Sequence, residues 1–283
     1  MPSLTAPGEL KELLARHGFR FSKSLGQNFL IDGNVLHKII EGAGVTKQDK
    51  ILEIGPGVGT LTQALARKAG EVTAVEIDRA LFPILEETLK GCSNVRVLRG
   101  DILKLDLNEL IREQFQGSPF KVVANLPYYI TSPLLVKLLE QPGPPARAVL
   151  VLQLEVARRL VAEPGTKEYG ALSLLIQYHC QAEMLFKIGP GNFHPQPQVD
   201  SGAVRLLWRP PLYRPRDEKF MFSLVKLAFG QRRKMLKGLL AKALAIPTEE
   251  VTDALTALGH SENIRGEELS VRDFALLADS LKR

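Results

Sequence analysis

Two kinds of apolar pattern alternate along most of the chain. Short runs rich in Val, Ile and Leu are typical of buried strands, whereas Val35, Leu36 and Ile39 recur at the spacing of a helix. The pattern predicts seven strands, over residues 50–54, 72–76, 95–98, 121–124, 148–152, 183–188 and 203–208. It predicts helices over residues 60–69, 79–90, 132–140, 155–161 and 172–180. Buried strands that alternate with helices indicate an α/β fold, in which helices cover both faces of a mostly parallel sheet.

The composition changes after the last predicted strand. Residues 209–216 form a proline-rich hinge, and only helical patterns follow it, with N-caps expected near Thr248 and Ser270. We therefore expect one domain over residues 1–210 and a small all-helical domain over residues 211–283. The first residues, 1–24, are polar and basic, and they predict a helix followed by a mobile arm.

Charge and composition narrow the class of protein. Lys and Arg total 37 against 31 acidic residues, so the net charge of +6 permits an anionic partner such as nucleic acid without requiring one. The two cysteines and five dispersed histidines predict no metal site. No apolar run approaches the roughly 18 residues of a membrane span, and the N-terminus lacks the apolar core of a signal peptide. We therefore expect a cytoplasmic protein that binds no membrane.

A glycine-rich turn links the first predicted strand to its helix. Glycines at positions 55, 57 and 59 allow a tight turn and a close approach of the backbone to a ligand. A dinucleotide-binding fingerprint needs its third glycine at position 60, where Thr60 stands, and Glu53 is unexpected beside a pyrophosphate. The turn therefore favours a cationic nucleoside that carries an amino acid, with a purely structural turn as the alternative.

Acidic residues follow the next two predicted strands. Glu76 ends the second strand, and a carboxylate at about this distance from the glycines accepts hydrogen bonds from both hydroxyls of a ribose. Asp101 follows the third strand, where it is placed to accept from the amine of an adenine. The carboxyl ends of parallel strands face one crevice. This ordered set resembles the class I S-adenosylmethionine-dependent methyltransferases.

The tetrapeptide Asn125-Leu126-Pro127-Tyr128 directly follows the fourth strand and is the most specific motif in the chain. Adenine N6 is a poor nucleophile because its lone pair is delocalised into the ring. The side-chain oxygen of Asn125 and the carbonyl of Leu126 can accept both amine hydrogens, which directs the lone pair at a sulfonium methyl group. Pro127 stiffens the turn, and Tyr128 offers a ring on which an everted base stacks. We expect Phe193 to cover the other face of the base, with capping of its proline-rich loop as the alternative.

Basic residues gather on both predicted domains. Arg232, Arg233 and Lys234 follow the hinge, and Arg20 and Lys23 precede the glycine-rich turn. Clusters on two sides of a crevice can grip an RNA backbone. Such runs are also often solvated helix faces. We expect these five residues to contact RNA.

The order of the motifs resembles the small-subunit (16S) ribosomal RNA adenine N6,N6-dimethyltransferases, the KsgA/RsmA/Dim1 family. The matching segments are residues 26–30, 53–59, 125–128, 193–201, 229–234 and 265–270. Gln196 departs from the family, whose members often carry a proline there, and this loosens the loop around Phe193.

The resemblance implies both a fold and an activity. The fold is a Rossmann-like class I methyltransferase domain with a seven-stranded sheet, followed by a helical domain that docks on the ribosome. The activity is dimethylation of two adjacent adenosines in the 3′-terminal hairpin loop of 16S rRNA, late in small-subunit assembly, by a protein that we expect to be a monomer. The implied contacts with S-adenosylmethionine fall on Asn28, Leu30, Gly55, Glu76, Asp101 and Asn125, and we add Gly57 from the same turn.

Three other functions stay open from the sequence alone. A large-subunit rRNA adenine methyltransferase of the macrolide-resistance type would not be expected to carry residues 229–234 and 265–270 together. A non-catalytic RNA-binding assembly factor on the same scaffold predicts erosion of Glu76 or of residues 125–128, which are intact. A nicotinamide-dependent oxidoreductase is disfavoured by Thr60.

Overall fold

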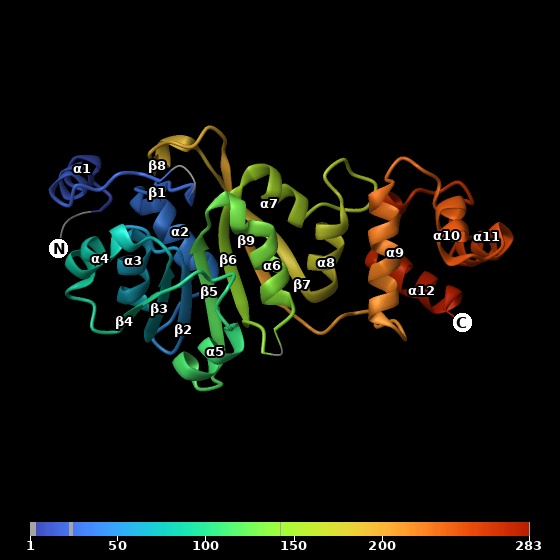
Figure 1. Cartoon of the computed structure of the whole chain (residues 1–283), viewed down its shortest axis with the longest axis horizontal. Helices are drawn as coiled ribbons and strands as arrows, with labels where there is room; N and C mark the ends of the chain where they lie inside the picture. The colour runs from blue at the N-terminus through green and yellow to red at the C-terminus, as the bar shows by residue number, and fades with distance from the viewer. Residues whose placement is uncertain (1–3, 23–24, 142, 283) are drawn as a thin grey trace. The chain divides into compact units, whose positions relative to one another are not determined.

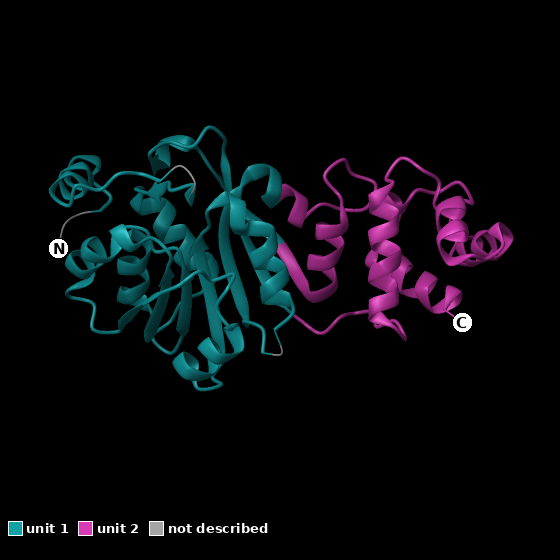
Figure 2. Cartoon of the chain, in the orientation of Figure 1, with its two compact units in different colours: residues 1–157, 183–208 teal, residues 158–182, 209–283 magenta. Residues whose placement is uncertain are grey.

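The computed structural model describes residues 4–22, 25–141 and 143–282, and Figure 1 shows their elements in chain order. The contacts divide the chain into two compact units (Figure 2). The first unit comprises residues 1–157 and 183–208, and the second comprises residues 158–182 and 209–283. Within the described ranges, no helix has the length and the apolar character that crossing a membrane requires.

A seven-stranded sheet forms the centre of the first unit, with the strands in the order β4-β3-β2-β5-β6-β9-β7. Strands β2 to β6 run parallel to one another, and β9 is antiparallel to β6. The predicted α/β fold with a mostly parallel sheet is therefore confirmed. The strands are β2 (Lys50–Ile54), β3 (Glu71–Glu76), β4 (Val95–Arg99), β5 (Phe120–Asn125), β6 (Arg147–Gln153), β7 (Cys180–Ile188) and β9 (Ser201–Trp208).

Helices cover both faces of this sheet. Residues 148–152 of β6 are all fully buried, and successive side chains of a strand point to opposite faces, so neither face of β6 meets solvent. Asp32 is the N-cap of helix α2, and its carboxylate accepts hydrogen bonds from the backbone N–H groups of Asn34 and Val35. Together with α3 it packs against the central strands. The helices up to residue 160 are α1 (Pro7–Arg16), α2 (Gly33–Ala43), α3 (Thr60–Lys68), α4 (Phe82–Leu89), α5 (Leu107–Phe115), α6 (Thr131–Leu139) and α7 (Leu154–Leu160).

One helix of the first unit was not predicted. Helix α5 buries Leu107, Leu110 and Phe115, and Asp106 caps its first turn. Short 3₁₀ turns complete the chain, namely η2 (Arg79–Leu81), η3 (Tyr128–Ile130), η4 (Pro190–Asn192) and η5 (Gly266–Glu268).

Aromatic rings in the segment before α2 contact one another and pack in one cluster with Val58 and Leu81 of the first unit. The rings of Phe19 and Phe29 lie 6.0 Å apart, and Phe21 lies 5.4 Å from each of them. Strand β1 (Phe29–Leu30) then pairs in antiparallel fashion with β8 (Phe193–His194). Residues 23 and 24, at the end of the N-terminal segment expected to be mobile, lie outside the described residues.

The second unit is built around its own apolar core. Its helices are α8 (Ala171–His179), α9 (Glu218–Gly230), α10 (Leu236–Leu244), α11 (Thr248–Ala257) and α12 (Val271–Leu281). Ser270 caps α12 as predicted, since its hydroxyl accepts from the N–H of Asp273. The cap of α11 is Pro247, one residue before the expected Thr248.

The boundary between the two units is not a single point in the sequence near residue 210. The chain does pass into the second unit for good at residue 209, next to the predicted boundary, but residues 158–182 also belong there. The reason is packing at long range, because Tyr169, Leu174 and Tyr178 are buried in the same cluster as the C-terminal helices. The hydroxyl of Tyr169 also donates to the carbonyl of Leu269 at 3.0 Å.

Replacing Tyr169 by Phe tests this buried hydrogen bond. The variant keeps the ring but removes the donor from the buried Leu269 carbonyl, so we expect the free energy of unfolding to fall by about 1–3 kcal/mol. Urea unfolding measures the change. Tyr213→Phe is the matched control, because Tyr213 is 41% exposed and should change stability by less than about 0.5 kcal/mol. Equal stability of Tyr169→Phe and the unmodified protein would contradict the role given to this bond.

Candidate active site

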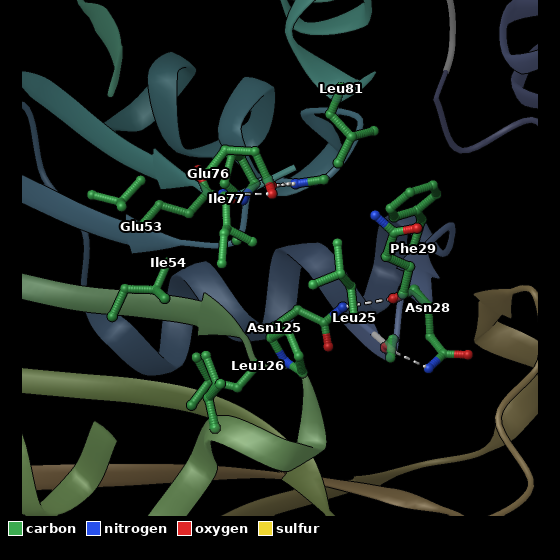
Figure 3. A pocket seen from close by; sticks show the side chains of 18 of the residues that line it. Leu25, Asn28, Phe29, Glu53, Ile54, Glu76, Ile77, Leu81, Asn125 and Leu126 are labelled. Atoms are coloured by element: carbon green, nitrogen blue, oxygen red, sulfur yellow. Dashed lines mark hydrogen bonds between the residues drawn. The ribbon is translucent and has the colours of Figure 1, made fainter. Parts of the chain in front are cut away.

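A pocket opens at the carboxyl ends of the parallel strands, where β3 and β5 flank β2 on opposite sides. This is the point at which the connections leave the sheet in two directions, and open α/β sheets bind their ligands there. The hollow, including its open mouth, has a volume of about 950 Å³. Its walls come from residues 25–30 and from the segments that follow β2, β3, β4 and β5 (Figure 3).

The glycine-rich turn after β2 needs its glycines for two physical reasons. Gly55 and Gly57 have φ of +70° and +60°, which are left-handed conformations that residues with a Cβ rarely adopt. A Cβ at Gly57 would also lie only 2.8 Å from Cδ1 of Phe29. The backbone therefore passes directly beside Phe29 and forms one wall of the pocket.

Glu76 is fixed in the pocket wall by backbone N–H groups. Its Oε1 accepts from Ile77 at 2.9 Å and from Asp78 at 2.8 Å, and its Oε2 accepts from Gly57 at 3.2 Å. Burial raises the pKa of this carboxyl, and the three N–H groups oppose part of that rise. Figure 3 shows the carboxyl group directed at the turn beside the pocket. The side chain is thus oriented before any ligand arrives.

Asp101 lies at the same edge of the sheet and lines the pocket after β4. Its Oδ1 accepts from the N–H of Leu103 at 3.0 Å, and a quarter of its side chain is exposed. The structure therefore brings the predicted ribose and adenine acceptors, Glu76 and Asp101, into one pocket.

Glu53 is the most unusual acid of the site. It is 1% exposed, and within the described part of the chain its Oε2 has no hydrogen-bond partner. Burial raises the pKa of Glu53 to about 8, the nearby Thr62 opposes this, and the Glu76 carboxylate adds to it. A buried acceptor that lines a pocket and lacks a partner is suited to a ligand that brings a donor or a positive charge.

The amide of Asn125 is oriented by residues 25–30, which precede α2 and are called the arm from here on. Its Nδ2 donates to the backbone carbonyl of Asn28 at 2.9 Å, and Figure 3 shows this bond crossing from the end of β5 to the arm. The Nδ2 of Asn28 in turn donates to the carbonyl of Gly26 at 3.0 Å. Because the donor end of the Asn125 amide is engaged, its oxygen is the end left to accept from a ligand.

The rest of the tetrapeptide lines the same pocket. Leu126 is 2% exposed and its N–H donates to Val151, which holds the turn on the sheet. Pro127 faces the glycine-rich turn, since its Cδ would lie 3.7 Å from a Cβ at Gly55. The Tyr128 hydroxyl bonds to Oγ of Ser201 at 3.0 Å, which fixes the position of the ring. Leu30, from β1, lines the pocket as well.

Phe193 is not brought to the pocket. Its backbone pairs with Leu30, but its ring is 2% exposed and packs in the core between α2, α3 and the sheet. The two-residue pairing of β1 with β8 directs the side chain inward. The expected stacking of this ring on a base therefore stays a prediction, and in this conformation the core holds the ring.

The expected RNA-binding residues differ in their surroundings. Arg232, in the second unit, is bound by Glu267 and by the carbonyls of Thr166 and Lys167, so it contributes to the fold of that unit. Arg233 and Lys234 beside it are exposed. Arg20 of the first unit is exposed too, and Lys23 lies outside the described residues.

Several residues that line the pocket were assigned no role from the sequence, among them Gln27 and Tyr129. Gln27 lines the pocket, and its Nε2 donates to Asp78 at 2.6 Å, while its Oε1 accepts from the N–H of Ser22 at 2.8 Å. Gln27 lies in the matching segment 26–30, but its partner Asp78 is 51 residues away in the chain, and no local pattern indicates such a contact. Tyr129 also lines the pocket and is 52% exposed; its place directly after Tyr128 was the available signal. Metal-ligand side chains do not cluster anywhere in the described part of the chain.

The strand order, the glycine-rich turn and the acids at the strand ends together define a Rossmann-like class I methyltransferase domain. A solved dimethyladenosine transferase from Plasmodium falciparum is similar to it, with a TM-score of 0.73 and 26% identity over 88% of this chain and 95% of that chain. A solved 23S rRNA methyltransferase, ErmE, has a TM-score of 0.72 and 30% identity, over 90% of this chain and 100% of that chain.

Sequence comparison then gives the family. The family model described as ribosomal RNA adenine dimethylase matches residues 18–282, and the chain belongs to this family. A protein named ribosomal RNA small subunit methyltransferase A from Alkaliphilus metalliredigens is 47% identical over 98% of this chain and 97% of its own length. A protein of the same name from Bacillus mycoides is 47% identical over 99% of this chain and 98% of its own length. The resemblance drawn from the motifs is thereby confirmed.

Replacing Glu53 by Gln tests the state of the buried carboxyl. In the unfolded chain this group ionises near its ordinary pKa of 4.5, whereas in the folded protein it ionises near pH 8. The stabilisation from the neutral form is therefore complete below pH 4.5 and is lost as the pH rises through about 8. We expect the unmodified protein to lose stability relative to Glu53→Gln over this range, by up to about 1.4 kcal/mol per pH unit.

Urea unfolding of the ligand-free proteins at several pH values measures this difference. Glu41→Gln is the matched control, because the Glu41 side chain is 75% exposed, and it should follow the unmodified protein. Parallel pH profiles for Glu53→Gln and the unmodified protein would show that Glu53 is charged in the folded state.

Proposed function

We propose that this chain transfers methyl groups from S-adenosylmethionine to N6 of two adjacent adenosines in the 3′-terminal hairpin loop of 16S rRNA. The substrate is the small ribosomal subunit or its precursor, late in assembly. Relatives of nearly equal length that are named ribosomal RNA small subunit methyltransferase A support this substrate. The single observation that carries the chemistry is the oriented amide of Asn125.

The pocket fits S-adenosylmethionine in its charges and its shape. The unpartnered Oε2 of Glu53 suits a cationic ligand, and the cradle at Gly57 admits a close approach that a Cβ would block. The residues that would hold the cofactor are Asn28, Leu30, Gly55, Gly57, Glu76, Asp101 and Asn125, all of which line the pocket. When bound, S-adenosylmethionine supplies an electrophilic methyl group.

The chain's own groups then make the adenine amine reactive. The Oδ1 of Asn125 and the carbonyl of Leu126 accept the two N6 hydrogens and so orient the lone pair. Such fixed acceptors need no reorganisation during the reaction, and they act more strongly in a pocket that excludes water. No general base is required, because the amine loses its proton after the methyl group has been transferred.

The base must leave its stack to reach these acceptors. Removing a base from a stack costs a few kcal/mol, and the cost is least for an unpaired nucleotide, which favours a hairpin loop over a duplex. The ring of Tyr128, held by Ser201, offers a surface on which the everted adenine can stack. The exposed Arg20, Arg233 and Lys234 are our candidates for contacts with the RNA backbone, and residues 211–283 for docking on the subunit.

The main alternative is methylation of large-subunit rRNA. The fold does not separate the two functions, since the TM-scores of 0.72 and 0.73 are nearly equal. The C-terminal segments 229–234 and 265–270 favour the small subunit. A non-catalytic assembly factor is disfavoured because Glu76 and Asn125 both line the pocket.

The direct test is incubation with labelled S-adenosylmethionine and ribosomal subunits from a strain that lacks this methylation. We expect two neighbouring adenosines in the 3′-terminal hairpin loop of 16S rRNA to carry the label, two methyl groups on each. Label in the large subunit would favour the alternative, and the absence of any transfer would contradict both.

Replacing Asn125 by Ala removes the proposed acceptor. Loss of one oriented hydrogen-bonding group of this kind costs about 10²–10³-fold in rate, so we expect single-turnover transfer to fall by that factor. The dissociation constant for S-adenosylmethionine, measured by calorimetry, should change by less than about tenfold. Asn108→Ala, at an exposed position of α5, is the matched control and should retain full activity. Near-normal transfer by Asn125→Ala would refute its assigned role.

Replacing Glu76 by Gln keeps the size of the side chain but exchanges one acceptor oxygen for a donor. If the carboxylate accepts from the ribose, the dissociation constant for S-adenosylmethionine should rise about 10- to 100-fold. Glu41→Gln should bind like the unmodified protein. An unchanged dissociation constant for Glu76→Gln would argue against the ribose contact.

A further inference from the structure

Tyr129 is an aromatic residue at the pocket that the proposed function leaves without a role. Three aromatic residues in the described part of the chain line the pocket, Phe29, Tyr128 and Tyr129. Phe29 is buried and Tyr128 is tied to Ser201, whereas Tyr129 is 52% exposed. An exposed aromatic ring inside a ligand pocket is a surface for stacking.

The strand order gives the position of Tyr129 relative to the acids of the pocket. Tyr129 follows β5, whereas Glu76 ends β3 and Asp101 follows β4. Neighbouring strands lie about 4.8 Å apart, so β5 and β4 are separated by roughly 14 Å. Tyr129 and both acids nevertheless line one hollow. Partial burial raises the pKa of Tyr129, and the charges of Asp101 and Glu76 raise it further. The phenol therefore lies within electrostatic reach of the acids on the far side.

The arm passes beside this ring. A Cβ at Gly26 would lie 3.9 Å from Cδ1 of Tyr129 and 4.0 Å from Cβ of Pro127. These are ordinary van der Waals distances, but Gly26 has a φ of +57°, so a residue with a Cβ would be strained there. Gln27, the next residue, ties the arm to Asp78 after β3. The arm and Tyr129 thus lie side by side in the pocket wall, and Gln27 connects this wall to the strand ends that carry the acids.

The charges at this end select among possible occupants. Carboxylates at Glu76 and Asp101 would repel the phosphates of an RNA strand, whereas a nucleoside without phosphates meets no such repulsion. The exposed apolar side chain here, Ile77 at 43%, offers a second surface for a flat base. These features favour the cofactor's nucleoside over a nucleotide of the substrate.

We propose that the ring of Tyr129 covers the nucleoside of S-adenosylmethionine and retains the cofactor in the pocket, and this rests on the function proposed above. Tyr129 is then a positioning residue for the cofactor, while Tyr128 serves the base. The ring slows release of both S-adenosylmethionine and the product S-adenosylhomocysteine, because both carry the same nucleoside.

The test compares Tyr129→Ala and Tyr129→Phe in the full-length protein, without RNA, by calorimetry and by stopped-flow displacement. For Tyr129→Ala we expect the dissociation constants of both S-adenosylmethionine and S-adenosylhomocysteine to rise about tenfold, through faster dissociation. Tyr129→Phe keeps the ring and should stay within about twofold of the unmodified protein. Tyr213→Ala, an exposed tyrosine of the second unit, is the matched control and should leave both constants unchanged.

Transfer to small subunits by the same variants separates the possible failures. We expect the KM for subunits to change less than about twofold in Tyr129→Ala at saturating cofactor. Unchanged cofactor affinity in that variant overturns the proposal, and a raised KM for subunits would assign the ring to the substrate instead. If the unmodified protein binds the cofactor but methylates no subunit, the proposed function fails while the comparison of dissociation constants still decides the role of Tyr129.

Discussion

One hydrogen bond joins the tetrapeptide after β5 to the arm of residues 25–30, and the proposed chemistry depends on it. The side-chain nitrogen of Asn125 donates to the carbonyl of Asn28, although the two residues are 97 positions apart in the chain. An amide has a donor end and an acceptor end, so fixing the donor decides which end a ligand meets. The orientation needed to accept from an adenine amine is therefore built before the substrate arrives. The arm of residues 25–30 belongs to the chemistry as much as the tetrapeptide after β5.

Electrostatics complete this arrangement. Glu53, Glu76 and Asp101 line the same pocket. The two that are buried, Glu53 and Glu76, differ in their hydrogen bonds. Three backbone N–H groups support Glu76, whereas Oε2 of Glu53 has no partner among the described residues. Burial raises the pKa of both, so the pocket carries less negative charge than three ionised carboxylates would give it. A cationic ligand would favour the ionised form of these carboxyls and would be attracted by them.

The sequence was informative where structure depends on local pattern. The parallel strands, the glycine-rich turn and the residues after β3, β4 and β5 could be placed because strand periodicity and strand order decide them. Phe193 could not, because a pairing of only two residues with β1 turns its ring inward. Arg232 is bound to Glu267, and Tyr169 to Leu269, through contacts between distant segments that no local pattern reports. Helix α5 was predictable in principle, since Asp106 and the spacing of Leu107, Leu110 and Phe115 are ordinary helix signals.

The most direct test of the central claim is a crystal structure with S-adenosylhomocysteine and a short RNA hairpin that presents the target adenosine. We predict that Oδ1 of Asn125 lies about 2.7–3.2 Å from N6 of the everted base, while its Nδ2 still donates to Asn28. An Asn125 side chain turned away from the base, or an amide whose nitrogen faces N6, would contradict the account.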